Sequence, residues 1–170
     1  CGIEQRSKDI ENFEKTGILK ENSNYVFGEG GAGTFSDGKL TTRTKNITAQ
    51  KAFILDTFIE AGAPEEISYL NHPHIGSDNL KLIVKNLRTK FEAIGGKIIF
   101  ETKVLDFQIK ADHKITLITP QKEYTADYAF FASGNSAYDT YKMLIKNNIK
   151  FKTKPFAIGV RVEHLQAEIN

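Results

Sequence analysis

A glycine-rich stretch near the start of the sequence has the residue types that could hold an anionic ligand. Between Gly28 and Gly38 the sequence GEGGAGTFSDG contains five glycines in eleven residues. Glycine lets a ligand approach the backbone closely and permits positive φ, so successive amides can form an anion-binding concavity. Thr34 and Ser36 add hydroxyl groups, and Lys39 adds a positive charge. By composition alone, a cofactor-facing loop and a plain surface loop are equally good interpretations.

Two nucleotide-binding motifs do not fit this stretch. A P-loop of the form GxxxxGK[ST] requires Ser or Thr after the lysine, whereas Leu40 follows Lys39. A Rossmann first turn follows a hydrophobic strand, and no such strand precedes Gly28. These mismatches weaken the hypothesis of a nucleotide-binding ATPase.

A second candidate site follows an apolar run. Residues 128–132 are continuously apolar, which is typical of a strand covered on both faces. The run leads directly into Ser133 and Gly134 and then into a helix through about Lys146. In α/β proteins, ligands bind where a strand ends and a helix begins. On the local pattern, a plain strand-to-helix connection remains the favoured interpretation.

The histidines and the single cysteine form no recognisable catalytic or metal motif. His72 and His74 are close in sequence, but no third ligand is nearby, so a metal site is a weak hypothesis. Cys1 has no visible base partner, and a single cysteine cannot form an internal disulfide. No catalytic acid or base can be assigned, and the polar residues that we would mutate first are Lys39, Arg43 and His74.

The composition is that of a soluble domain without a strong preference for charged partners. The 170 residues are 40% hydrophobic and 26% charged, and the formal net charge is +2. Nucleic-acid binders have a clustered basic face, which is absent from this sequence. No apolar run approaches the roughly 20 residues of a membrane-spanning helix, and there is no signal peptide. We therefore expect a cytoplasmic protein that binds neither nucleic acid nor a membrane.

Hydrophobic spacing predicts the elements that must position these residues. Helical patterns cover residues 6–15, 49–61, 64–70 and 78–94, and a further helix follows the turn at 133–136. Ser77 is the expected N-cap of the helix at 78–94, and Gly95 ends it. The spacing of Ser136 and Asp139 matches a capping box for the last helix.

Strand patterns are concentrated in the second half of the chain. Residues 97–100 directly follow a helix, as in a helix-then-strand unit. Residues 104–110, 114–119 and 123–128, with a tight turn at Asp112 and His113, predict a β-meander. Residues 155–164 are predicted to form a strand that needs a partner. Because only six residues follow it and no methionine starts the sequence, we expect an excised piece of a longer protein.

Three segments, taken together, resemble one family. They are GEGGAGTFSDGKLTTR (28–43), NHPHIGSDNLKLIVKNLR (71–88), and FFASGNSAYDTYKML followed by KPFAIGVRVEH (130–164). In this order they are similar to the bacterial FAD-dependent dehydrogenases, a group of NAD(P)/FAD-dependent oxidoreductases. The resemblance covers nearly the whole chain. Ser133 stands where the family usually has threonine, and Asn135 stands where histidine is frequent.

The resemblance implies an α/β fold with two parts. Residues 1–150 would be a partial Rossmann-like FAD/NAD(P)-binding domain with a β-meander, and residues 151–170 the start of a substrate or cap domain. In the family, the first strand carries GxGxxG and the second ends in a glutamate that holds the adenosine ribose. Neither element occurs in this sequence, so the first βαβ unit would be missing.

The resemblance also implies the cofactor, which is FAD in the full-length protein, with NAD(P)H as a second candidate. The residues that it places against FAD are Gly30, Gly31, Ala32, Gly33, Thr34, Ser36, Asp37, Gly38, Lys39, Val104, Ser133 and Gly134. We expect a hydride-transferring oxidoreductase, and we expect this piece alone to bind FAD weakly or not at all and to be inactive. The alternative is a non-enzymatic α/β interaction module whose glycine-rich loop binds a partner.

Overall fold

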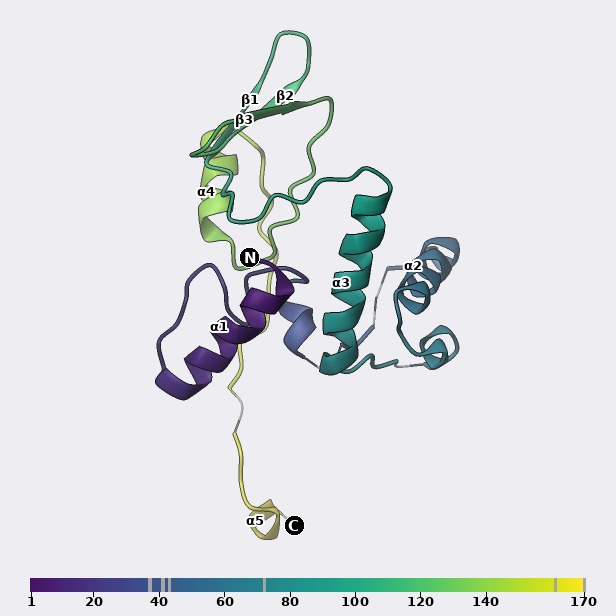
Figure 1. Cartoon of the computed structure of the whole chain (residues 1–170). Coiled ribbons are helices and arrows are strands. Elements are labelled where there is room, and N and C mark those ends of the chain that lie inside the picture. The colour runs from purple at the N-terminus through teal and green to yellow at the C-terminus, as the bar shows by residue number, and fades with distance from the viewer. Residues whose placement is uncertain (37, 41, 43, 72, 161, 170) are drawn as a thin grey trace. The chain divides into compact units, whose positions relative to one another are not determined.

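The structure, a computed structural model, describes residues 1–36, 38–40, 42, 44–71, 73–160 and 162–169. They form a mixed α/β fold of two compact units, Cys1–Ser136 and Ala137–Asn170 (Figure 1). In order, the elements are α1 (Ile3–Thr16), η1 (Ala32–Phe35), α2 (Thr48–Glu60), η2 (Glu65–Ser68), α3 (Ser77–Ala93), β1 (Asp106–Ile109), β2 (Ile115–Ile118), β3 (Glu123–Ala126), α4 (Tyr138–Lys146) and α5 (Gln166–Ile169). Here η denotes a short 3-10 helix.

Helix α1 confirms the first predicted helix, although it begins earlier than expected. It ends at Gly17, whose φ of 73° allows its amide to donate to the carbonyl of Phe13 at 2.7 Å. At the other end, the amide of Ile3 donates to the carboxylate of Glu29 at 2.6 Å. A negative charge at this position is favourable because it faces the positive end of the helix dipole. The start of α1 is therefore tied to the glycine-rich loop.

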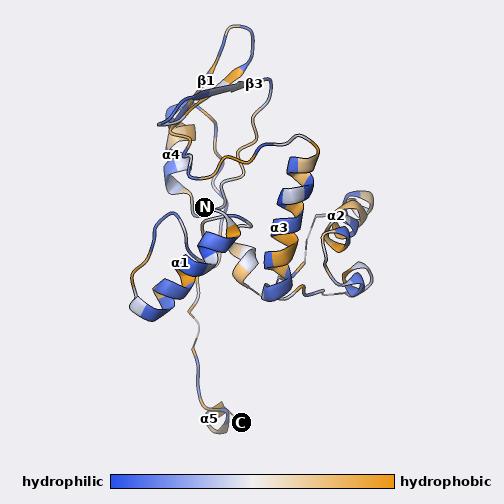
Figure 2. Ribbon diagram, viewed as in Figure 1, coloured by the Kyte–Doolittle hydropathy of each residue, from blue (hydrophilic) through white to orange (hydrophobic). Residues whose placement is uncertain are grey.

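The apolar core of the first unit lies among α2, η2 and α3. Its buried members are Leu55, Ala61, Ala63, Ile67, Ile75 and Ile83. Figure 2 shows many hydrophobic residues along α2, whereas α1 is mostly hydrophilic. The helices predicted at 49–61 and 78–94 are confirmed, and that predicted at 64–70 forms the shorter 3-10 helix η2.

The start of α3 differs from the prediction. Ser77 is already the first helical residue, and Gly76 is the N-cap without a side-chain capping bond. The φ of Gly76 is 84°, which turns the chain into the helix one residue before the expected position. The prediction of Ser77 as N-cap was therefore wrong.

The sheet of the first unit is an antiparallel meander in the order β1-β2-β3. Phe107 on β1 lies opposite Leu117 on β2, and the hydroxyls of Thr116 and Thr125 are 2.9 Å apart across β2 and β3. The first turn contains His113 at a φ of 65°. The predicted meander and its turn are confirmed.

Three predicted strands are not formed by the described residues. Residues 97–100 and 128–132 and the described residues of 155–164 contain no assigned strand. The apolar side chains of Phe130 and Phe156 are 93% and 81% exposed. A strand requires hydrogen bonds from a neighbouring strand, and the only sheet among the described residues is β1-β2-β3. These predictions were wrong for this chain because an apolar run indicates burial but does not show that a neighbouring strand is present.

The last long helix also begins differently from the prediction. The N-cap of α4 is Ala137, without a side-chain capping bond, so the expected capping box of Ser136 and Asp139 is absent. A carboxylate oxygen of Asp139 accepts instead from the amide of Thr140 at 3.0 Å. The division between the two units lies here, whereas the predicted division at residue 150 concerns parts of a longer protein and stays a prediction. No described helix is both long and apolar enough to cross a bilayer.

Candidate functional site

The glycine-rich loop is built around a buried arginine of α1. Arg6 has no exposed surface, and Cζ of its guanidinium lies over the ring of Phe35, 4.8 Å from the ring centroid. It donates hydrogen bonds to the backbone carbonyls of Asn24 (2.8 Å), Tyr25 (3.1 Å), Gly28 (3.4 Å), Glu29 (2.7 Å) and Gly31 (2.8 Å). Burial lowers the pKa of Arg6, but a guanidinium stays charged in proteins. The loop is therefore folded around a positive charge.

The side of the loop that we name the outer edge, Gly30 to Gly33, offers free backbone donors. All four residues are exposed. The amides of Gly30, Ala32 and Gly33 donate no hydrogen bond to any described residue. Exposed amides grouped in this way are the donors that an oxyanion needs.

The glycines of the loop differ in whether the chain itself requires them. A Cβ added at Gly30 would lie 2.1 Å from Oγ1 of Thr34, and one added at Gly38 would lie 2.7 Å from Leu80. Both also have positive φ. A Cβ at Gly33 meets no heavy atom within 4 Å, and its φ is not positive. The space around Gly33 is therefore open to a ligand.

The two hydroxyl groups predicted to face the cofactor lie inside the loop or bond to its backbone, and their contact with FAD stays a prediction. Thr34 is 1% exposed, and its Oγ1 is buried without a hydrogen-bond partner. Ser36 donates its hydroxyl to the carbonyl of Gly33 at 2.8 Å and accepts from the amide of Gly38. The donors that the loop presents are therefore backbone amides rather than these two hydroxyls. Asp37 lies outside the described residues.

Two of the polar candidates are brought together from distant parts of the sequence. Lys39 and His74 are partners in an isolated antiparallel bridge, which is flanked by a bond from the amide of Leu40 to the carbonyl of Pro73 at 3.1 Å. Residues opposed in this way project their side chains from the same face, and both are exposed. The third candidate, Arg43, lies outside the described residues, as does His72. In the described part of the chain, no group of three or more His, Cys, Asp or Glu could hold a metal ion.

The remaining predicted contacts lie in irregular chain. Val104 is half-buried and precedes β1, although the amide of Leu105 already bonds to the carbonyl of Ile118 at 2.8 Å. Ser133 and Gly134 are exposed in the connection between β3 and α4. Gly134 has a φ of 82° with no atom near an added Cβ. Their contact with FAD stays a prediction.

An ion-pair network that the sequence did not reveal connects the loop to α3. The Arg88 guanidinium contacts carboxylate oxygens of Glu29 and Glu4, each at 2.9 Å. The hydrogen bond with Glu4, together with the charges of both carboxylates, raises the pKa of Arg88. The pKa of Glu4 is lowered, first by a backbone hydrogen bond and then by Arg88. Because Glu4 belongs to α1 and Arg88 to α3, this network holds the loop against both helices. Figure 1 shows α1 and α3 beside η1.

The spacing of residues in the sequence already indicated that Arg6 is buried. Ile3, Arg6 and Ile10 are spaced three and four residues apart, so they lie on one face of α1. Both isoleucines are buried, at 3% and 5% exposure. A charged residue on an otherwise buried face indicates that hydrogen-bond acceptors lie inside the protein. Here these acceptors are the backbone carbonyls to which Arg6 donates.

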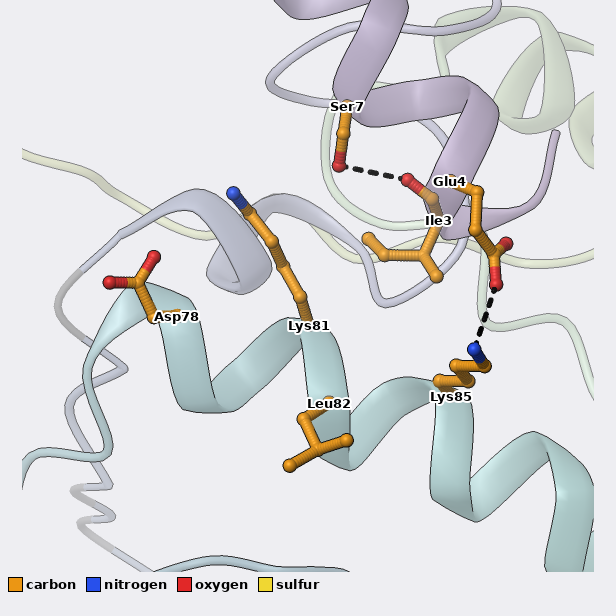
Figure 3. Close-up of a pocket in the computed structure, with 7 residues that line it drawn as sticks. All are labelled: Ile3, Glu4, Ser7, Asp78, Lys81, Leu82 and Lys85. Carbon is orange, nitrogen blue, oxygen red and sulfur yellow. Dashed lines mark hydrogen bonds and ion pairs between the residues drawn. The ribbon is translucent and has the colours of Figure 1, made fainter.

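A shallow cleft lies between α1 and α3. It is lined by Ile3, Glu4, Ser7, Asp78, Lys81, Leu82 and Lys85 (Figure 3). Its two lysines are matched by two carboxylates, and Lys85 lies 4.0 Å from Glu4. None of the residues predicted to contact the cofactor lines it, so we assign it no role in the site.

Comparisons with known proteins place the chain beside a longer bacterial protein. No family model matches the chain. Over 168 residues, 99% of the chain, it is 44% identical to an uncharacterized protein of Clostridium beijerinckii. The match covers 31% of that protein, so the chain spans about a third of the relative's length.

Proposed function

We propose that this chain is part of a bacterial flavin-dependent oxidoreductase in which the outer edge binds the diphosphate of FAD. The observation that carries the proposal is the group of exposed amides at Gly30, Ala32 and Gly33, none of which donates to a described residue. Exposed amide N–H groups that lie close together in the chain favour an oxyanion, and the open space at Gly33 lets it approach. The donor set thus fits a diphosphate.

The finer fold belongs to the same proposal. Residues 97–100 and 128–132 would be strands of a Rossmann-like sheet in the longer protein. The exposure of Tyr128 (82%) and Phe130 (93%) supports this, because large exposed apolar side chains in sequence usually contact another surface. The bound flavin would accept or donate a hydride, while this chain's residues bind and orient it. A small molecule is the proposed substrate, and NAD(P)H a further proposed cofactor.

The first test is the visible absorbance of the protein purified at its natural length. We expect a yellow protein with a flavin spectrum that dithionite bleaches. A colourless protein that gains no absorbance on addition of FAD would overturn the proposal. It would favour a non-enzymatic interaction module that uses the same loop.

The second test locates the cofactor. Gly33→Val places its Cβ where no heavy atom outside the adjoining backbone lies within 4 Å, so we expect a loss of binding to report on the ligand rather than on folding. Gly159→Val is the matched control, because Gly159 also has open space and no positive φ. We expect Gly33→Val to weaken FAD binding roughly tenfold or more, with the control unchanged. Equal FAD affinity in the two variants would place the flavin elsewhere.

A further inference from the structure

The direction of the amides on the outer edge follows from the position of Arg6. The described peptide bonds are all trans. In a planar trans peptide, the C=O group and the N–H group of the next residue point in opposite directions. The carbonyls of Glu29 and Gly31 point at Arg6, at 2.7 and 2.8 Å. The amides of Gly30 and Ala32 belong to the same two peptide groups and therefore point away from Arg6.

Packing alone does not account for an arginine at this position. Its neighbours on the buried face of α1 are the apolar Ile3 and Ile10, and Arg6 differs from them in donating to the loop carbonyls. Its described hydrogen-bond partners are neutral carbonyls. Burying a charge without an opposite charge opposes folding. The positive charge is thus held directly behind the outer edge, where it adds to the amide dipoles.

We infer that Arg6 is a positioning residue for an oxyanion. From inside the loop it turns the amides of Gly30 and Ala32 outward and adds a positive field, without touching the ligand. This inference rests on the proposed function, in which the oxyanion is the FAD diphosphate. The ligand class that it names is a diphosphate ester.

The test is a titration of the 170-residue chain with inorganic pyrophosphate, followed by the amide NMR resonances of Gly30, Ala32 and Gly33. Ionic strength is held constant with chloride. In the unmodified chain these resonances shift and saturate. Arg6→Lys keeps the charge but loses the planar set of donors, so we expect roughly tenfold weaker binding. Lys8→Met is the control, because Lys8 is exposed on the same helix as Arg6.

A second variant tests the amide itself and does not depend on how well Arg6→Lys folds. Ala32→Pro removes one N–H at the first position of η1, where proline fits the helix. The preceding Gly31 has a ψ of −171°, which a following proline accepts. We expect Ala32→Pro to lose the pyrophosphate response although the contacts of Arg6 persist.

The outcomes separate the two ideas. Weaker pyrophosphate binding in Arg6→Lys and Ala32→Pro, but not in Lys8→Met, supports the inference. Unchanged binding in either of the first two variants overturns it, as does an equal loss in Lys8→Met. If the unmodified chain does not respond to pyrophosphate, the inference fails, whereas the proposed function fails only if the protein at its natural length binds no FAD.

Discussion

The glycine-rich loop and residues 128–132 differ in where their partners lie. The loop is held by side chains of its own neighbourhood. Arg6 binds its carbonyls, and the side chain of Asn24 orders the segment that leads into it through bonds to the backbone of Lys20, Glu21, Val26 and Phe27. Residues 128–132 contain no assigned strand, and Phe130 among them is 93% exposed.

The difference shows that this chain alone fixes the conformation of the glycine-rich loop. Strand formation by residues 128–132, in contrast, depends on a partner strand that the described sheet does not supply. Side-chain to backbone bonds need only one residue at the right place. A buried strand needs another strand on each side. The predictions below test this comparison, beginning with the largest expected effect.

Removing the guanidinium should disrupt the loop most strongly. Arg6→Met leaves several inward carbonyls without donors, so we expect the free energy of unfolding to fall by about 3 kcal/mol or more. Urea denaturation followed by circular dichroism measures it. Lys8→Met is the control, because Lys8 is exposed on the same helix. A loss no greater than that of the control would show that the loop does not depend on Arg6.

The second effect concerns the packed glycine. Gly30→Ala places a Cβ 2.1 Å from Oγ1 of Thr34 and 2.9 Å from Val84 at a φ of +86°, so we expect a loss of about 1–3 kcal/mol. Gly33→Ala, which meets nothing, should change stability by less than about 0.5 kcal/mol. Thermal or urea unfolding distinguishes them. Equal effects would mean that the loop is more loosely packed than its contacts indicate.

The third expected effect is an increase in stability. Oγ1 of Thr34 is buried without a partner, so Thr34→Val exchanges an unsatisfied hydroxyl for a methyl group of the same shape. We expect an increase in stability of about 1 kcal/mol. Thr34→Ser keeps the hydroxyl and should not stabilise. If Thr34→Val is more stable but binds FAD less well, the hydroxyl has a role in the bound state.

The fourth effect depends on pH. The pKa of Asp9 is lowered, first by the Ser23 hydroxyl and then by Lys20 and Gln5. A folded-state pKa below the unfolded value of about 3.9 stabilises above that pH, and this contribution is lost as pH falls through the folded value. Ser23→Ala removes the largest cause, so it should destabilise at neutral pH by about 1 kcal/mol or less. The difference from the unmodified chain should shrink below the unfolded pKa. A difference that stays constant in urea titrations across this range would exclude the linkage.

The smallest effect lies in the apolar run. Because Phe130 is 93% exposed, Phe130→Ser should change the stability of this chain by less than about 0.5 kcal/mol. In the protein at its natural length, burial of the same side chain in a sheet would raise that loss to about 3 kcal/mol. Thermal unfolding of both proteins makes the comparison. A small effect in both would argue against the proposed sheet.

The sequence predicted the elements whose signal is local. The spacing of Leu80, Ile83 and Leu87 defined α3, and the alternation around Phe107 defined the meander, because both are set by the repeat of one element. The pairing of Lys39 with His74 was not predictable, since it depends on a distant segment. Arg6 was missed for the same reason, although its place between Ile3 and Ile10 marked a buried face.

The position of Arg6 also bears on the order of folding. Its five carbonyl partners lie between 18 and 25 residues further along the chain. Contacts over such short separations form early because little chain entropy is lost in closing them. We therefore expect the loop to take its shape during synthesis, before α3 has left the ribosome. The helices made later would then fold against an outer edge that already exists.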